Sequence, residues 1–175
     1  MLRLRPDLEV VPFRGNVDTR LQKLADGVAD ATMLAVAGLN RLEKSDRVTA
    51  ILEADHFMPA PAQGAIGIAA RCDDSAAQAL IAPLNHRSTH SAIVAERAML
   101  AVLDGSCRTP VGAWSALQGD QIELRGEILS LDGQQHFAAS ASGPLAAAET
   151  LGAALGQRLL ESAGTAFLAQ WAAVP

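Results

Sequence analysis

The stretch "LDGSCRTPVGAW", residues 103–114, contains a cysteine in a setting where a thiol could react. Small and polar neighbours such as Ser106 favour an exposed loop around Cys107, and Pro110 defines where the chain leaves that loop. A thiol attacks in its ionised form, the thiolate. The positive charge of Arg108 favours ionisation of Cys107, whereas a position just after the C-terminus of a helix opposes it. These residues predict an accessible thiol at Cys107. A buried and inert cysteine, the usual fate of a free thiol, is the alternative.

The chain has one other cysteine, Cys72, at the end of an apolar segment, where a buried and inert thiol is expected. A bond between Cys72 and Cys107, or with a partner's thiol, would make the chain a redox or structural thiol protein. The lack of a Cys-x-x-Cys motif counts against that function. The chain's four histidines form no cluster with cysteines, so the sequence predicts no metal site.

Three arginines follow two apolar segments that are predicted to be strands. Arg14 ends the first segment, Arg20 lies six residues later in the first turns of a helix, and Arg41 follows the second segment. Strand ends and helix N-termini in open α/β sheets bind anions, and the guanidinium group pairs with carboxylates. We therefore predict a site for a ligand that carries carboxylates. The alternative is a set of surface arginines, one of them paired with Asp18 or Asp26.

A glycine-containing loop, "PAQGA" at residues 61–65, precedes a further apolar segment. Gly64 would let the backbone approach a ligand closely, and Gln63 could present its amide to that ligand. A simple turn without a ligand is the alternative for these residues.

The first half of the chain alternates between strand-like and helical patterns. Such alternation predicts parallel α/β construction. The predicted strands are residues 8–13, 30–39 and 65–72, and the predicted helices are residues 17–27, ended by Gly27, and 73–84, capped by Asp73 or Asp74. Two or three strands are too few for a doubly wound domain, and the first begins almost at residue 1. We therefore expect this half to be incomplete.

The second half changes to an α+β pattern. A helix is predicted at residues 89–103, three strands at 110–117, 121–130 and 134–142, and two helices at 144–164 and 165–171. The turn signals "QGD" and "LDG" separate the strands and predict an antiparallel meander with helices on one face. We place the domain boundary near residues 83–85, which divides the chain into 1–84 and 85–175.

Composition and charge exclude several classes of protein. Apolar residues make up 50% of the chain and charged residues 19%, which is typical of a folded domain. The net charge of -5 argues against general binding to nucleic acid. The longest apolar run, residues 31–39, is too short to span a membrane, and the first ten residues contain no signal-peptide core. A cytoplasmic location is expected.

Four blocks of the sequence resemble a known family. "ERAMLAVLDGSCRTPVGA", residues 96–113, is similar to the cofactor-attachment signature of the porphobilinogen deaminases, also called hydroxymethylbilane synthases. "RGNVDTRL", "LAVAGLNRL" and "PAPAQGAIGI" resemble other blocks of that family, in the same order and at compatible spacings. The resemblance covers essentially the whole chain.

The resemblance implies a cofactor and a reaction. Cys107 would hold a dipyrromethane cofactor through a thioether bond. The cofactor would prime stepwise addition of porphobilinogen, with loss of ammonia, until a linear hydroxymethylbilane is released by hydrolysis. Arg14, Arg20 and Arg41 match arginine positions of the family and would hold the acetate and propionate groups of the pyrroles.

The resemblance also assigns roles to two loops. Gln63 and Gly64 match a loop that lines the active-site cleft and would bind substrate, and the backbone of Ser106 and Arg108 would line the attachment loop. Ala62 departs from the family pattern, because glycine is common at that position.

The family architecture accounts for the expected incompleteness. Residues 1–84 would be part of a periplasmic-binding-protein-like α/β region, comprising the second half of a central domain and a segment that crosses back to a first domain. Residues 85–175 would be a whole α+β domain with a three-stranded antiparallel sheet and helices on one face. Unpaired strand edges would be open to a separate N-terminal portion or to self-association.

The resemblance places the catalytic aspartate of the family in a part that these residues do not match. Asp18, Asp26 and Asp30 do not fit its motif. We therefore expect the chain to hold porphobilinogen and linear pyrroles, without a nucleic-acid or membrane partner, and to be inactive alone. A non-catalytic module that binds polycarboxylates reversibly is the alternative function.

Overall fold

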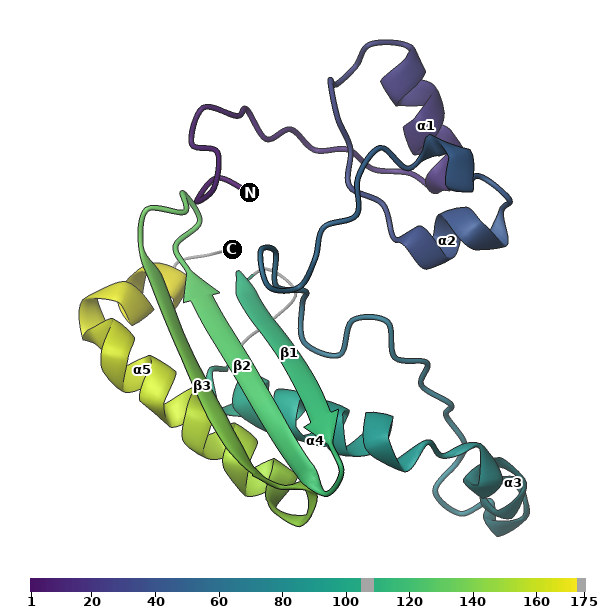
Figure 1. Ribbon diagram of the computed structural model, residues 1–175, viewed down its shortest axis with the longest axis vertical. Helices are drawn as coiled ribbons and strands as arrows, with labels where there is room; N and C mark the ends of the chain where they lie inside the picture. The colour runs from purple at the N-terminus through teal and green to yellow at the C-terminus, as the bar shows by residue number, and fades with distance from the viewer. Residues whose placement is uncertain (105–108, 173–175) are drawn as a thin grey trace. The chain divides into compact units, whose positions relative to one another are not determined.

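Figure 1 shows the computed structural model, which describes residues 1–104 and 109–172. Its contacts divide the chain into two compact units, Met1–His56 and Phe57–Pro175. The sequence places a boundary near residues 83–85 instead, whereas residues 57–65 pack against the helix and strand that follow them. The domain assignment 1–84 and 85–175 stays a prediction.

The second unit contains a three-stranded antiparallel sheet in the order β1-β2-β3 (Figure 1). Its strands are β1 (Val111–Gln118), β2 (Gln121–Leu129) and β3 (His136–Pro144). Two long helices, α4 (Arg87–Val102) and α5 (Ala148–Ala172), pack on one face of the sheet, and the short helix α3 (Ser75–Ile81) precedes them. The predicted antiparallel meander with helices on one face is confirmed.

The register of β2 explains where the core forms. Alternate residues of a strand face opposite sides of its sheet, so one face of β2 points toward the helices. The largest fully buried side chains come from β2, α4 and α5: Ile122, Leu124, Ile128, Met99, Leu155 and Leu159. Burial of a side chain of this size contributes about 1.5–3 kcal/mol. Gly126 of β2 leaves room for Met99, whose Sδ would lie only 2.4 Å from a Cβ at that position.

Both hairpin turns use a glycine with positive φ, as the turn signals predicted. Gly119 has φ 58° and Gly133 has φ 72°, a region that favours glycine. In the second turn the Ser130 hydroxyl and the Gln134 N–H donate hydrogen bonds to the carboxylate of Asp132. These bonds, the one from Ser130 most of all, hold the pKa of that carboxyl below its usual range. The stabilisation of this turn is therefore present at neutral pH and is lost as the pH falls through the lowered pKa.

Helix α5 is interrupted at Gly164, whose φ of 73° and ψ of 166° are not helical. This break lies where the sequence predicts a long helix to end and a short one to begin. Among the described residues no helix, α5 included, has both the length and the apolar character that a membrane span requires.

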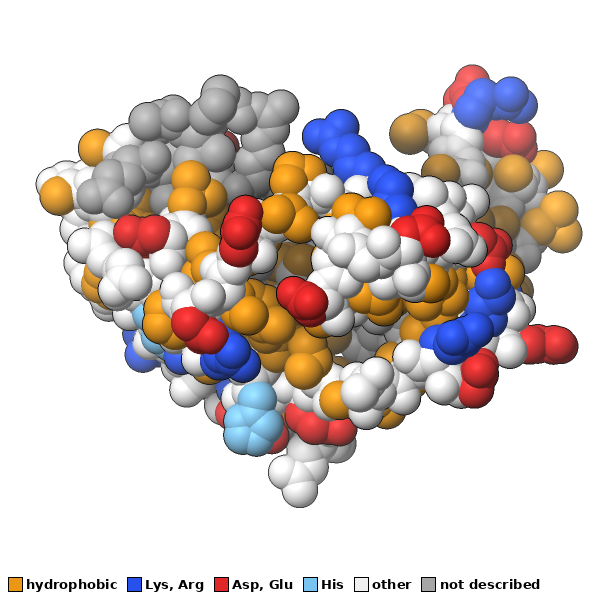
Figure 2. All heavy atoms as spheres, turned by 90° about the horizontal axis from the view of Figure 1, so that it is seen from above, with side chains coloured by type: hydrophobic (Ala, Val, Ile, Leu, Met, Phe, Trp, Pro, Cys, Tyr) orange, Lys and Arg blue, Asp and Glu red, His pale blue; other side chains and the backbone are white. Residues whose placement is uncertain are grey.

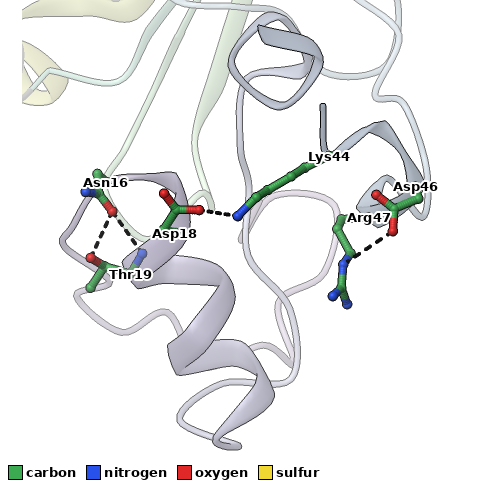
Figure 3. A network of polar contacts seen from close by, with 6 residues as sticks. All are labelled: Asn16, Asp18, Thr19, Lys44, Asp46 and Arg47. Atoms are coloured by element: carbon green, nitrogen blue, oxygen red, sulfur yellow. Dashed lines mark hydrogen bonds and ion pairs between the residues drawn. The ribbon is translucent and has the colours of Figure 1, made fainter. Parts of the chain in front are cut away.

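The first unit contains helices α1 (Val17–Ala25) and α2 (Val36–Arg41) and the 3-10 helix η1 (Ser45–Arg47). Helix α1 is capped at its N-terminus by Asn16, whose Oδ1 accepts the Thr19 N–H at 2.9 Å (Figure 3). It ends where predicted, because Gly27 adopts φ 74° and its N–H donates to the Leu24 carbonyl at 3.1 Å.

The predicted strands of the first half are wrong for this structure. Residues 1–104, all of them described, contain no β-strand, and α2 occupies part of the predicted strand 30–39. A strand needs a neighbouring strand to accept its hydrogen bonds, and the described chain brings none beside residues 8–13 or 65–72. The α/β arrangement is therefore not confirmed. Cys72 is exposed rather than buried, because the segment that it ends is itself exposed.

Candidate functional site

A pocket of about 460 Å³ lies in the second unit, between the loop at residues 59–65, the first half of α4 and the strand β1. Its lining includes both residues that the sequence predicts for substrate, Gln63 and Gly64. Polar groups also come from α4 and β1, among them Glu96 and Ser115. The pocket therefore combines a loop backbone, a carboxylate and a hydroxyl.

The loop at this pocket consists of two consecutive turns. The Gln63 N–H donates to the Ala60 carbonyl at 3.0 Å, and the Ala65 N–H donates to the Ala62 carbonyl at 3.3 Å. The third residues of these turns have positive φ, 63° at Ala62 and 84° at Gly64, as type II turns require. Gln63 therefore lies between two tight turns, at the wall of the pocket.

Glu96 ties this loop to the rest of the second unit. Its side chain is only 7% exposed, and its two oxygens accept hydrogen bonds from different elements. Oε2 accepts the Ala62 N–H at 2.7 Å, and Oε1 accepts the Ser115 hydroxyl at 2.9 Å. A buried carboxylate needs such donors, because burying its charge without them would cost several kcal/mol.

Glu96 belongs to the block "ERAMLAVLDGSCRTPVGA", but its residue type alone predicted no role for it. The sequence did indicate a buried position, because Glu96 lies four residues after Ala92 and three and four residues before Met99 and Leu100. On a helix this spacing places Glu96 on the same face as these apolar residues. A charged residue on the apolar face of a helix indicates a buried polar contact.

The same loop covers the free edge of β1. The Ala113 N–H donates to the Pro59 carbonyl at 2.9 Å, on the side of β1 away from β2. Gly112 permits this close approach, since a Cβ there would lie 3.1 Å from the Cβ of Met58. The outward-facing N–H of Ala113 is thereby unavailable for pairing with another chain.

Replacing Ala62 with glycine is expected to stabilise the second unit by about 0.5–1 kcal/mol, because alanine is strained at positive φ and glycine is not. Ala60→Gly is the matched control and is expected to lower stability by about 0.5–1 kcal/mol, since Ala60 is not among the residues with positive φ. Urea unfolding of the two variants measures both effects. An equal loss of stability in both would contradict the strain at Ala62.

Arg14 and Arg20 flank one turn in the first unit. Nε of Arg20 donates to the Gly15 carbonyl at 2.9 Å, and Nζ of Lys23 donates to the Arg14 carbonyl at 2.9 Å. These bonds fold Arg20 back toward the turn that follows Arg14, at the N-terminus of α1. Positive side chains and the first turn of a helix both favour anions there.

Asp18 and Asp26, the acidic residues that could pair with these arginines, interact with other side chains. Lys44 bonds to Asp18 (Figure 3), and Nε2 of Gln22 donates to Asp26 at 2.8 Å. The structure does not bear out the alternative in which one of the arginines pairs with Asp18 or Asp26.

Arg41 is the last residue of α2 and is exposed. Helix α2 lies against the start of α1, since a Cβ on Gly38 would lie 3.7 Å from Cγ2 of Val17. The Lys44–Asp18 ion pair joins the same two regions (Figure 3). The three arginines thus belong to neighbouring helices of one unit, while Gln63 and Gly64 belong to the other.

Cys107, Ser106 and Arg108 lie outside the described residues. The described chain ends before them at Asp104 and resumes at Thr109, and the buried residues Leu103 and Val111 anchor α4 and β1 on the two sides. The predicted roles of these residues, and of the arginines and the Gln63 loop, stay predictions.

Comparison with known proteins gives two matching family models. One, described as "Porphobilinogen deaminase, dipyromethane cofactor binding domain", matches residues 1–79. The other, described as "Porphobilinogen deaminase, C-terminal domain", matches residues 91–161. Together they cover both halves of the chain.

Individual relatives carry the same name. Proteins called porphobilinogen deaminase from Nitrobacter hamburgensis and Nitrobacter winogradskyi are 51% and 48% identical to this chain over 172 residues, which is 98% of this chain and 54% of each relative. The one from Syntrophobacter fumaroxidans is 45% identical over 160 residues, 91% of this chain and 52% of the relative. The chain spans about half the length of the curated relatives that it matches.

Proposed function

The chain belongs to the porphobilinogen deaminase family, and we propose that it carries the dipyrromethane cofactor of such an enzyme on Cys107. The enzyme as a whole would polymerise porphobilinogen, with loss of ammonia, to hydroxymethylbilane. The observation that supports this most directly is the match of the chain to the cofactor-binding and C-terminal models of the family. A cytoplasmic location is part of the proposal.

The residues of the first unit fit a ligand with several carboxylates. Arg14 is exposed, and the bond from Arg20 to Gly15 uses only Nε, which leaves the terminal nitrogens of Arg20 for a carboxylate. Each guanidinium can donate two parallel hydrogen bonds to one carboxylate group. Arg14, Arg20 and Arg41 would therefore hold the acetate and propionate groups and orient the pyrroles.

The bound dipyrromethane would supply the pyrrole carbon at which each new unit is joined. The role of Cys107 is attachment: its Sγ–H bond and the C–O bond of a hydroxymethyl group break, a C–S bond forms and water leaves. A thiolate is the reactive form in this step, so a neighbouring cation such as Arg108 would assist it. Gln63 and Gly64 would contact the substrate at the wall of the pocket.

The proton-transfer residue is proposed to come from outside these 175 residues. Asp18 is bonded to Lys44, and Asp26 accepts from Gln22, so both acidic groups already serve local contacts. We therefore expect attachment of the cofactor by this chain, without turnover.

The apolar surface supports the proposed incomplete, periplasmic-binding-protein-like region. Val10 is 65% exposed and Ile66 is 87% exposed, in segments that the sequence predicts as strands. Figure 2 shows hydrophobic side chains reaching the surface among charged ones. Segments of this kind become strands when a neighbouring strand accepts their hydrogen bonds. A separate N-terminal portion, or a second copy of the chain, would supply that neighbour.

The proposal is tested by intact-mass measurement after incubation of the 175-residue chain with preformed hydroxymethylbilane. The expected result is a pyrrolic adduct that resists reducing agents, located on a peptide containing Cys107. A folded chain that gains no mass would overturn the proposal. A mass change that is reversed by reduction would support the thiol redox alternative instead.

Removing two arginines is expected to slow this loading. In the double variant Arg14→Gln/Arg20→Gln, the loading rate should fall about 100-fold or more, because each of the two lost hydrogen bonds to a charged group contributes about 1.5–3 kcal/mol. Arg3→Gln is the matched control, since Arg3 is an exposed arginine of the same unit. Equal loading rates in the double variant and the control would contradict the role of Arg14 and Arg20. The time course of adduct mass gives both rates.

A further inference from the structure

The buried carboxylate of Glu96 has no part in the roles proposed so far. We propose that Glu96 is a positioning residue, which holds the double turn at residues 60–65 so that Gln63 stays at the wall of the pocket. The claim that Gln63 then meets a pyrrole substrate rests on the proposed function, whereas the claim that Glu96 orders the loop does not.

The carboxylate of Glu96 bridges two elements of the second unit. Its two oxygens accept from Ala62 at 2.7 Å and from Ser115 at 2.9 Å, so one side chain of α4 joins the loop to β1. Hydrogen bonds to an ionised acceptor are shorter and stronger than those between neutral groups. The distance from Ala62 to Oε2 is short for an N–H donor, as expected for a carboxylate acceptor.

The first of the two turns, residues 60–63, is unfavourable by itself. A type II turn needs positive φ at its third residue, and glycine is the usual occupant. Ala62 adopts φ 63° in that place, which costs about 1–2 kcal/mol for an alanine. The second turn has Gly64 in the equivalent place and carries no such cost. The turn that requires external support is therefore the one whose backbone N–H is bound by Glu96.

The contact with Glu96 lies directly beside Gln63 in the chain. The loop is also held at Pro59, whose carbonyl accepts the Ala113 N–H. That bond holds the start of the loop on β1, three residues before Ala62. The bond from Ala62 to Glu96 fixes the point next to Gln63, and Gln63 lines the same pocket as Glu96. Loss of the carboxylate would therefore release Gln63 in particular.

Amide hydrogen exchange measured by NMR on the full 175-residue chain tests this inference without any ligand. In Glu96→Leu the protection of the Ala62 amide should fall at least about tenfold, because its acceptor is gone. In Glu96→Gln the protection should return to within about threefold of wild type, since the side-chain oxygen still accepts. Ser115→Ala should leave the Ala62 amide protected, because it removes only the other bond.

The Leu124 amide, in the core strand β2, is the internal reference. Its protection should stay within about threefold of wild type in Glu96→Gln and Glu96→Leu. Unchanged protection at Ala62 in Glu96→Leu would overturn the inference. An equal loss at Ala62 and Leu124 would also overturn it, because that result would mean that Glu96 acts on the stability of the whole unit.

A binding measurement separates this inference from the proposed function. The dissociation constant for porphobilinogen, measured by calorimetry on the loaded chain, should rise at least about fivefold in Glu96→Leu and recover in Glu96→Gln. If wild type binds no porphobilinogen, the proposed substrate role of Gln63 fails, while the exchange data still decide whether Glu96 orders the loop. If binding is normal in Glu96→Leu although Ala62 has lost its protection, the ordered loop does not serve substrate.

Discussion

Replacing Cys107 with serine is expected to abolish the covalent adduct that the wild-type chain gains from hydroxymethylbilane. A serine hydroxyl is not appreciably ionised near neutral pH and cannot replace a thiolate as the attacking group. Intact mass of the incubated variant should therefore equal the mass of the unmodified chain. This is an all-or-none result, unlike the graded effect expected for the arginines.

Cys72→Ser is the matched control for this experiment. Cys72 is exposed and free, so it is the competing thiol that a reactive pyrrole would meet. The Cys72→Ser variant should load as completely as wild type. An adduct that persists in Cys107→Ser and disappears in Cys72→Ser would move the attachment site to Cys72 and contradict the family-based assignment. Circular dichroism of both variants shows whether they are folded.

Reversible binding would be seen in the same samples. If Cys107→Ser takes up no mass but still binds pyrrole carboxylates with wild-type affinity, the arginine site works without the thioether. That outcome favours the non-catalytic polycarboxylate-binding module over a cofactor carrier. We expect weaker retention instead, because a covalently linked pyrrole cannot dissociate from the chain, whereas a reversibly bound one can.

Replacing Gly152 with alanine is expected to lower the free energy of unfolding of the second unit by about 3 kcal/mol, the upper part of the range for overpacking. A Cβ on Gly152 would lie 2.0 Å from the carbonyl oxygen of Ala95 and 3.0 Å from the Cβ of Ala98. The nearer atom belongs to the backbone of α4, so α4 and α5 must move apart. Urea unfolding should show this loss, with a fall in Tm of roughly 10 °C.

Helix propensity acts in the opposite direction at this site. Alanine exceeds glycine by about 1 kcal/mol in the interior of a helix, so a net loss identifies the contact with α4 as its cause. Gly67→Ala is the control, because a Cβ on Gly67 meets no atom within 4 Å and its φ is not positive. Its effect should stay within about 0.5 kcal/mol. Stabilisation by Gly152→Ala would contradict the close packing of the two helices.

The elements of the second half of the chain were predictable because signals close together in the sequence define them. Alternating apolar residues, with turn glycines such as Gly119 and Gly133, predicted three strands and their antiparallel order. The helix at residues 89–103 and the break at Gly164 were also predicted, and both are confirmed. In each case the residues that make the deciding contacts are close together in the sequence.

The first half shows the limit of that approach. Helices α1 and α3 were predicted from their ends, at Gly27 and at Asp73 or Asp74; both helices form, and Asp74 is the N-cap of α3, which ends at Ile81. The apolar segments between them were predicted as strands, but they form none in this structure. An apolar pattern indicates that side chains prefer burial, but it does not indicate whether a neighbouring strand is present to pair with the segment.

In the candidate site, too, some residues could be predicted from the sequence and others could not. Residue type and family resemblance selected Cys107, the three arginines and the loop with Gln63, whose roles remain predictions. Glu96 was not selected, although its contacts give the loop at the pocket its anchor. A carboxylate on the apolar face of a helix indicates a buried polar contact, but the sequence does not identify the groups that donate hydrogen bonds to that carboxylate.

By itself the sequence determined the family, the helices with clear ends and the antiparallel meander of the second unit. The tertiary structure alone decided that Glu96 joins Ala62, 34 residues away, to Ser115, 19 residues away. It also decided that Gly152 brings α5 against the backbone of α4. Helices and hairpins form from neighbours in the chain, whereas a buried carboxylate, a close helix contact and a paired strand each depend on a partner that local pattern does not specify.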